Sequence, residues 1–592
     1  MGFLFLITVS LCLVFCIFYY LYNDLYSKCI KKIALLKELP NNLPEVHVPV
    51  LLKHQSNQIP SWLNGVMYQI GPGRFNIQQN NGSTFSIRHV FDGLPFIHRF
   101  EINGKERTVK YNSRCIAKLF ESRIQNHSFK GVLFFGHIIV DMNFFQWIYH
   151  FMARVVNQIR FMLLGRACDS PDGQVIGVTV TPNFPLPSSR DIQRSKDEHV
   201  LVTKTDANAL QKIHAETLEP QYLFDYSTFN KHLWGQLTSA HHQQDPITKE
   251  VFNVIVRIVP FPCLTVFKTS EDGKVTILAD ITQRHDNDKG SVRASYIHSF
   301  WLTKNYIIIP EAPLAFKDGG RNLLMTGSVV SSMHWDKNDA STTYCHIVRR
   351  DHEYSTEKGD GGGGGLIASI PIPAFFCFHV GNAFETQCPT TGDTLLVLDC
   401  ASFSNGNIIH QLYRFGTSSS NGKETYVNDG IAHSPLEYGD LIRYKLNINK
   451  VKMVSSKTLA KNIDFLRFNQ SYSMKPEHRY IYGCRLKDST EANCLVKVDL
   501  NTLSIKVYDE GSQYTSCSEP IFVPKPTQDK EEDDGVLLSL VNHHSSSSRG
   551  NCYLVIIDAK DMKEIARINV GGFTAITFHG SFVDHEFKSV NV

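Results

Sequence analysis

Short runs of apolar and β-branched residues, separated by turn residues, recur along the chain from about Ile59 to the C-terminus. Representative runs are residues 199–205, 250–259, 305–314, 393–402, 493–500, 535–541 and 552–559. Runs of this length, with turn residues between them and no alternating helical segments, predict β-strands joined largely by hairpins. The body of the protein is therefore expected to be all-β, as a sandwich, a barrel or a propeller.

The segment 141–164 has a different period. Its apolar residues recur every three to four positions, which predicts one amphipathic helix inserted among the strands. Two interpretations remain open. The helix either packs on the sheets or lies in a membrane interface, as helices with a wide aromatic face and a basic polar face do. In the second case we expect lipid contact through Phe144, Phe145, Ile148, Phe151, Met152 and Val155, with Arg154 on the polar face.

The first 23 residues carry no charged side chain and are long enough, as a helix, to cross a bilayer. They predict a transmembrane anchor over residues 1–23, followed by a basic juxtamembrane linker over residues 24–44. The linker has four lysines and only two acidic residues, Asp24 and Glu38. Positive charge on the C-terminal side predicts that the body, residues 45–592, is cytosolic, and we expect the endoplasmic reticulum as the host membrane.

Composition narrows the possible functions. The 60 Lys and Arg residues nearly balance the 57 Asp and Glu residues, so the chain has no basic field and we expect no nucleic acid partner. The 14 Cys include no C-x-x-C pair, which argues against a zinc ribbon or a disulfide scaffold. Oligomeric state has no signal in the sequence. The 25 His are the unusual feature.

Four of these histidines share one context, because each ends or interrupts an apolar segment. They are His241, His298, His379 and His579, which are 57, 81 and 200 residues apart. Such spacing excludes a local zinc finger and suits ligands that converge from different blades on a central axis. A single histidine of this kind is more often a core residue, but four in matching contexts indicate a metal site.

Eight segments, in order along most of the chain, resemble the carotenoid cleavage oxygenase family. They are IPSWLNGVMYQIGPGRF, HVFDGLPFIHRFEINGKERTVKYNSR, SAHHQQDP, YIHSFWLT, FHVGNAFE, RYIYGC, SEPIFVPKP with EEDDGVLLSLV, and TFHGSFV. The segment at residues 518–535 resembles the animal branch, which includes the β-carotene oxygenases and the retinoid isomerase of the retinal pigment epithelium. The chain departs from the family at Ile70, where relatives have Asn, and at Leu466, where they have Pro.

The resemblance implies a seven-bladed β-propeller whose axis holds Fe(II) through His241, His298, His379 and His579. In the family, three glutamates orient the ligating histidines. The corresponding positions here are Glu219, Glu519 and Asp464, and the last has a side chain one methylene shorter. We therefore expect Asp464 to hold its histidine less firmly or through water.

The implied function is cleavage of a conjugated double bond of a carotenoid or apocarotenoid, with O₂ as co-substrate and membrane lipid as a partner. Two other functions remain open. One is a retinoid isomerase or isomerooxygenase that uses the same iron, and the other is a propeller that binds carotenoids or retinoids without turnover.

Overall fold

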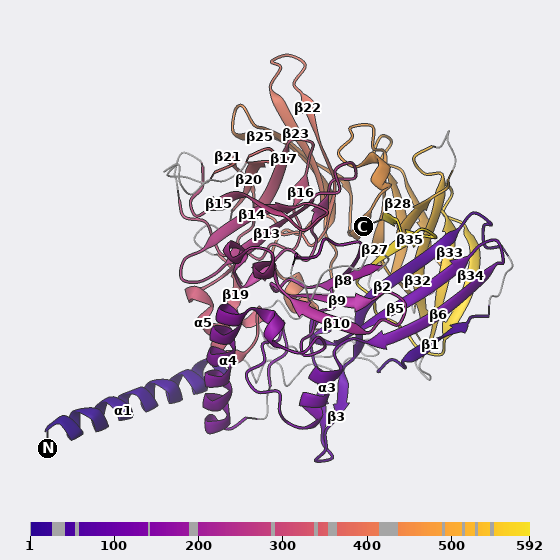
Figure 1. The fold of residues 1–592 in the computed structure, drawn as a ribbon. Helices are drawn as coiled ribbons and strands as arrows, with labels where there is room; N and C mark the ends of the chain where they lie inside the picture. The colour runs from indigo at the N-terminus through magenta and orange to yellow at the C-terminus, as the bar shows by residue number, and fades with distance from the viewer. Residues whose placement is uncertain are drawn as a thin grey trace.

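The structure is a computed structural model of the 592-residue chain. It describes all residues except Met1, 27–41, 54–57, 140–141, 189–198, 286–289, 337–340, 353–363, 414–435, 488–491, 512–514, 527–530, 545–549 and Val592. Most of the predicted linker over 24–44 lies outside the described residues. Seven antiparallel sheets surround a common axis, so the body is a seven-bladed β-propeller, as predicted (Figure 1).

The first blade is closed by both ends of the chain. Its strand order is β1-β6-β5-β2-β35-β36, and the C-terminal strand β35 pairs with β2 from Gly65↔Asp584 to Ile70↔His579. The bounds are Val46–Leu51 (β1), Asn64–Arg74 (β2), Leu94–Asn103 (β5), Thr108–Cys115 (β6), His579–Asp584 (β35) and Ser589–Asn591 (β36). This pairing closes the ring with backbone hydrogen bonds, because the C-terminal strands complete the blade that the N-terminal strands begin.

The other six blades follow in chain order. The second blade comprises Thr179–Pro182 (β7), Val200–Lys204 (β8), Leu210–His214 (β9) and Pro220–Phe224 (β10). The third comprises Leu237–Thr238 (β11), Gln243–Gln244 (β12), Val251–Arg257 (β13), Cys263–Thr269 (β14) and Val275–Ile281 (β15). The fourth comprises Trp301–Leu302 (β16), Tyr306–Glu311 (β17), Thr342–Arg349 (β20) and Leu366–Pro373 (β21).

The fifth blade comprises Val380–Gln387 (β22), Thr394–Ser402 (β23), Asp440–Asn447 (β24) and Lys452–Ala460 (β25). The sixth comprises Ile463–Arg467 (β26), Tyr480–Leu486 (β27), Asn493–Asp499 (β28) and Ile505–Tyr508 (β29). The seventh comprises Thr515–Cys517 (β30), Ile521–Pro524 (β31), Gly535–His543 (β32), Asn551–Asp558 (β33) and Glu564–Gly571 (β34). All seven runs predicted as strands contain one. Their apolar side chains pack between neighbouring blades, as for Leu396 and Leu398 of β23 with Ile370 of β21.

A helical cap lies on one side of the propeller (Figure 1). It consists of the helices Lys118–Gln125 (α3), Phe144–Leu164 (α4), Arg321–Thr326 (α5) and Ile408–Gln411 (α6), with the hairpins Asn76–Gln78 (β3) with Thr84–Ser86 (β4) and Leu314–Phe316 (β18) with Met333–Trp335 (β19). The predicted helical insertion is thus confirmed as α4. Asn143 caps its start, because the Asn143 side chain and the Gln146 backbone and side chain form a capping box.

The N-terminal helix α1 (Gly2–Leu21) extends away from the body and meets it at α4 (Figure 1). Phe15 and Tyr19 of α1 contact Phe144 edge-on, and Phe18 contacts Phe151 at a ring-centroid distance of 5.5 Å. Within the described part of the chain, none of the helices has both the length and the apolar character that a membrane crossing requires. The prediction of a transmembrane anchor over residues 1–23 is therefore not supported.

Candidate metal centre

The four predicted histidines come together at the propeller axis. His241 lies between β11 and β12, His298 just before β16, His379 directly before β22, and His579 at the start of β35. One ring nitrogen from each residue lies within 4.8 Å of the others. Each histidine therefore comes from the innermost strand region of a different blade, which explains why their spacing in sequence is so wide.

The cluster has the dimensions of a metal site. The Nε2 atom of His579 lies 3.1 Å from the Nε2 atoms of both His241 and His379. Two nitrogen ligands at about 2.1 Å from one ion, and at a right angle to each other, are about 3.0 Å apart. Unprotonated nitrogens this close repel each other unless a cation lies between them, so the donor set fits a metal ion.

Carboxylates on the remaining three blades hold three of the four rings. The Nδ1 atoms of the histidines lie 2.8 Å from Asp206 (His298), 2.6 Å from Asp464 (His379) and 3.0 Å from Glu519 (His579). Since an ionised carboxylate only accepts hydrogen bonds, Nδ1 must donate, which leaves Nε2 unprotonated and directed at the cluster.

Burial disfavours the charged forms of two of these histidines. Burial and the three neighbouring histidines lower the pKa of His241 well below its usual value, and burial, opposed by Glu519, lowers that of His579 to about 4. Burial alone would raise the pKa of Glu519, but the positive charge of Arg467 and the hydrogen bonds from Arg467 and His579 lower it to about 2. Arg467 Nη2 also donates to Glu519 at 2.8 Å. Neutral imidazoles have the free lone pair that a divalent metal ion needs.

The structure corrects two predictions about the carboxylates. Glu219 is not at the site: its side chain is 58% exposed and pairs with Arg114 at 2.8 Å. Asp206, which follows strand β8, takes the place expected of Glu219, and the sequence analysis missed it. Asp464 contacts His379 directly despite its shorter side chain, and the ring of Phe465 stacks on the same imidazole at 4.9 Å.

The signal for Asp206 was present but weak. Asp206 directly follows the apolar run 199–205, but nothing local in the sequence indicates that His298 lies across from it. His242, the residue after His241, points away from the cluster and contacts Lys204 and the ring of Phe184. Arg467, which orients Glu519, was also missed.

Two cavities adjoin the cluster. An apolar cavity of about 40 Å³ is lined by His298, His379 and His579 together with Phe91, Phe378, Phe465, Phe578, Tyr438 and several aliphatic residues. A polar cavity of about 130 Å³ is lined by His241, His379, Arg467, Glu519 and Lys249, among others. Small apolar ligands and water therefore have separate approaches to the histidines.

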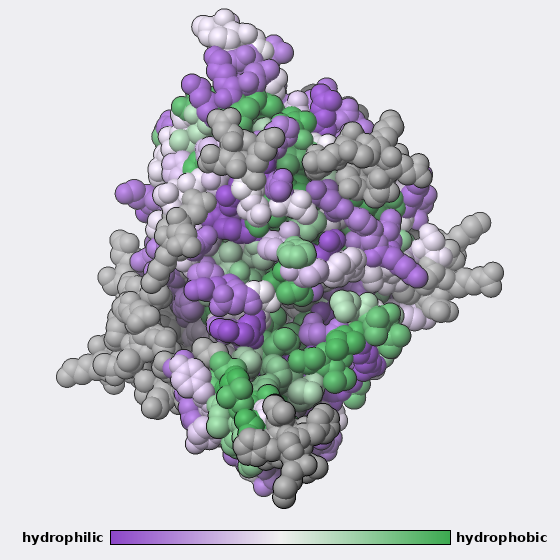
Figure 2. Space-filling view, turned by 90° about the vertical axis from the view of Figure 1, so that its left-hand side faces the viewer, coloured by the Kyte–Doolittle hydropathy of each residue, from purple (hydrophilic) through white to green (hydrophobic). Residues whose placement is uncertain are grey.

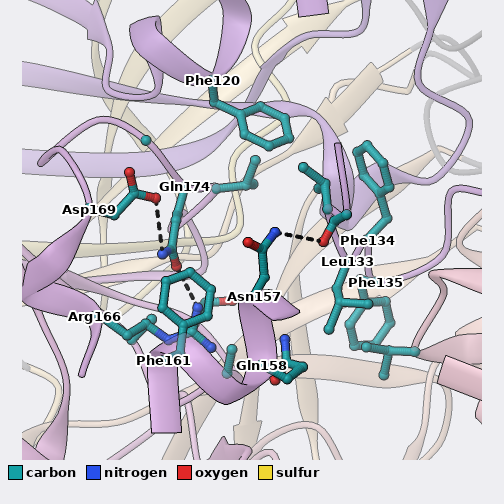
Figure 3. A pocket seen from close by; sticks show the side chains of 18 of the residues that line it. Phe120, Leu133, Phe134, Phe135, Asn157, Gln158, Phe161, Arg166, Asp169 and Gln174 are labelled. Carbon is teal, nitrogen blue, oxygen red and sulfur yellow. Dashed lines mark hydrogen bonds between the residues drawn. The ribbon is translucent and has the colours of Figure 1, made fainter. Parts of the chain in front are cut away.

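A third, larger cavity of about 320 Å³ lies under α4 and shares Phe91 with the small apolar cavity (Figure 3). Its wall also includes Asp206 and Tyr296, and the Tyr296 hydroxyl donates to Asp206 at 2.8 Å. An elongated ligand in this cavity would therefore point toward the residues that hold His298.

Comparison with known proteins agrees with this geometry. The family described as retinal pigment epithelial membrane protein matches residues 41–584. A carotenoid dioxygenase of Neurospora crassa is 28% identical over 590 residues, covering 92% of this chain and 90% of the relative. The mitochondrial carotenoid-cleaving dioxygenase of Homo sapiens is 25% identical over 568 residues, covering 88% and 86%.

Among solved structures, an apocarotenoid oxygenase mutant of Synechocystis superposes with a TM-score of 0.65 at 20% identity, covering 92% of this chain and 97% of the other. A lignostilbene dioxygenase of Pseudomonas brassicacearum gives 0.62 at 18% identity, covering 93% and 97%. The fold is shared with both. The chain belongs to the retinal pigment epithelial membrane protein family, and it is an enzyme of the dioxygenase class.

Proposed function

We propose that this protein is a non-haem Fe(II) enzyme that uses O₂ to cleave a conjugated double bond of a carotenoid or apocarotenoid. Each new carbonyl takes one oxygen atom of the O₂ that is consumed. The observation that carries the proposal is the histidine cluster, with His241, His298, His379 and His579 as the iron ligands, beside a cavity walled by phenylalanines.

The ligand set suits this chemistry. Imidazole is a good ligand for Fe(II), and four neutral ligands leave the ion its full charge. Bound Fe(II) would supply the redox chemistry that activates O₂. Asp206, Asp464 and Glu519 fix the orientation of three rings, so that their lone pairs remain directed at the ion throughout turnover.

The apolar cavity positions the alkene. Phe91 contacts Phe578 at 5.1 Å and Phe378 at 5.9 Å, and Phe378 lies 4.9 Å from the His298 ring. These rings exclude water and offer flat surfaces to a planar polyene. The double bond that lies beside the histidines is the one that reacts, so the shape of this wall selects the bond.

The decisive experiment is anaerobic reconstitution with Fe(II), followed by metal analysis and chromatography of the products after O₂ is admitted. Two shorter carbonyl products from β-carotene or an apocarotenal support cleavage. A product with the mass of the substrate indicates an isomerase, and iron binding with no product indicates a binding protein. Absence of bound iron would refute the proposed ligand set.

We also propose that α4 contacts membrane lipid. Its inner face fixes it to the cap: Trp147 is fully buried and donates to the Met325 carbonyl at 2.7 Å, and Arg154 is buried and donates to the same carbonyl at 3.1 Å. Arg154, predicted on the polar face, is therefore inside. Phe144 is also buried, whereas Ile148, Phe151 and Val155 are partly buried. The predicted six-residue contact stripe therefore combines two faces of the helix.

Most of the exposed side chains of α4 are apolar, and Gln146 and Arg160 are the exposed polar ones besides the N-cap Asn143. The apolar outward face comprises Phe145, Tyr149, Met152, Val156, Ile159, Met162, Leu163 and Leu164, which are between 46% and 73% exposed. Figure 2 shows apolar side chains gathered on the lower part of the surface from which α1 projects. An apolar surface of this kind, beside the 320 Å³ cavity under α4, is typical of a surface that docks on a bilayer, and a water-insoluble substrate enters from there.

A further inference from the structure

The cavity under α4 is lined by aromatic rings and by polar side chains, among them Arg166 and Gln174, which lie next to each other (Figure 3). Six phenylalanines line it: Phe91, Phe120, Phe129, Phe134, Phe135 and Phe161. The polar side chains Asn157, Gln158, Arg166 and Gln174 come from α4 and the segment that follows it. Asn157, Arg166 and Gln174 already have protein partners, but the Arg166 guanidinium has further N–H groups, and a wholly hydrocarbon ligand cannot accept hydrogen bonds from them.

Arg166 is the central polar group. Its Nη1 atom donates to Gln174 at 2.6 Å and its Nε atom donates to the Asn208 carbonyl at 2.9 Å. The guanidinium lies 4.7 Å from the centre of the Phe161 ring. These contacts hold the planar group in one orientation at the cavity wall, which lowers the entropic cost of using its remaining N–H groups to bind a ligand.

Within the part of the chain that the structure describes, no carboxylate forms an ion pair with Arg166. The two nearby acidic residues have other partners. Asp169 pairs with Arg123 at 2.8 Å, and Asp225 accepts hydrogen bonds from the Arg166 backbone N–H at 2.7 Å and from the Ser227 hydroxyl. Arg166 is partly buried, and burial lowers its pKa, although the charges of Asp225 and Asp169 oppose this. A fixed, partly buried cation of this kind favours an oxygen-bearing ligand.

We propose that Arg166, supported by Gln174, binds the oxygenated end of a linear apocarotenoid, a carboxylate in preference to an aldehyde. The polyene then runs along the phenylalanines toward Phe91 and the histidines. This inference rests on the proposed function and adds the substrate class to it. It makes Arg166 a specificity-determining residue: holding one end of the chain also fixes which double bond lies at the metal.

The test uses the full-length, iron-loaded protein and three probes: an apocarotenoic acid, the apocarotenal with the same polyene, and the hydrocarbon β-carotene. In Arg166→Met, kcat/KM for the acid should fall roughly 10- to 100-fold, because a hydrogen bond to a charged group is lost. The aldehyde should lose less and β-carotene should change little. Arg166→Lys should retain part of the preference for the acid.

Arg257→Met is the matched control. Arg257 is also partly buried and lies over an aromatic ring, that of Trp234 at 4.3 Å, but it does not line the cavity. The Arg257→Met variant should leave the ratio of kcat/KM for the acid to kcat/KM for β-carotene unchanged. Equal loss on all three probes in both Arg166 variants, or an unchanged ratio in Arg166→Met, would overturn the proposal.

A binding measurement separates this inference from the proposed function. Quenching of tryptophan fluorescence by the three polyenes is measured on metal-free wild type and on both Arg166 variants. Preference of the wild type for the acid, lost in Arg166→Met and partly kept in Arg166→Lys, supports the subsite even if no probe is cleaved. Equal affinity of the wild type for acid and hydrocarbon contradicts the subsite even if both are cleaved.

Discussion

The propeller axis and the outward face of α4 differ in how their side chains are held. At the axis, three histidines are each hydrogen-bonded to a carboxylate from another blade, and all seven blades contribute a histidine or a carboxylate. On α4, the eight outward apolar side chains are between 46% and 73% exposed, although the helix itself is fixed from behind by Trp147 and Arg154.

The difference follows from what each region is proposed to do. A metal site needs atoms placed to within a few tenths of an ångström, and three of the four histidines are accordingly buried and oriented by a second residue. A membrane contact needs only apolar area on a rigid support, and individual side chains there can change their rotamers freely. Substitutions at the axis should therefore have large, residue-specific effects on iron binding and turnover. Substitutions on the outward face of α4 should have additive effects on binding to lipid vesicles.

The largest effect is expected from the histidines themselves. Replacing His241, His298, His379 or His579 with Ala should remove bound iron and abolish turnover, because each change deletes one ligand. Metal analysis and circular dichroism of the purified variants check this. His242→Ala is the control, since His242 faces Lys204 and should leave the iron content unchanged. Two of the four variants with full iron content and activity would contradict the assignment.

The carboxylates come next. Asp206→Ala and Asp464→Ala should each weaken iron binding about 10- to 100-fold, because the ring of His298 or His379 loses its orienting partner. Competition with a chelator measures the affinity. Glu219→Ala should bind iron as the wild type does, since its carboxylate pairs with Arg114 at the surface. A large effect at Glu219 with none at Asp206 would reverse the structural assignment.

The sequence predicted the clustered histidines better than the carboxylates that contact them, for a physical reason. Each histidine stands in an apolar segment, which marks it as buried, and the family motifs surround all four positions. The partner of a histidine is set by the packing of blades: Asp206 reaches His298 across 92 residues and Asp464 reaches His379 across 85. No local pattern encodes such a contact, so a plausible glutamate was chosen in place of Asp206.

The sequence predicted that the cap helix α4 exists, but not which of its side chains point inward. The period of 141–164 was enough to predict α4, whose one face packs on the body while the other is exposed; lipid contact by the exposed face stays a prediction. What the period could not indicate was that Arg154 points inward, since its burial depends on the free carbonyls of α5, such as that of Met325. A polar side chain at a helix position is buried only when such partners exist elsewhere in the fold.

A third, intermediate effect is expected from the face of α4. Replacing Phe145, Met152 and Val156 with Asp should weaken binding to phospholipid vesicles, because each inserted side chain contributes up to about 1.5–3 kcal/mol. Cleavage of vesicle-borne substrate should slow more than cleavage of detergent-dispersed substrate. The control replaces Val48, Ile247 and Phe261, which are 75%, 86% and 76% exposed elsewhere, with Asp. Equal loss in both triple variants would mean that general surface charge, and not this face, is responsible.

The smallest effect on iron binding is expected from Asp464→Glu, which lengthens a carboxylate that already contacts its histidine directly. From the sequence, Asp464→Glu would restore the longer side chain found in relatives and improve the site. The direct 2.6 Å contact with His379 now predicts the opposite. The Asp464 side chain is only 4% exposed, so an added methylene must displace a neighbour such as Phe465 or the His379 ring. Overpacking of this kind costs about 1–3 kcal/mol of stability.

We therefore expect Asp464→Glu to lower the unfolding midpoint and to weaken iron binding less than Asp464→Ala does. Chemical denaturation and chelator competition measure the two quantities. Tighter iron binding in the glutamate variant would show that Asp464 holds His379 less firmly than its distance indicates.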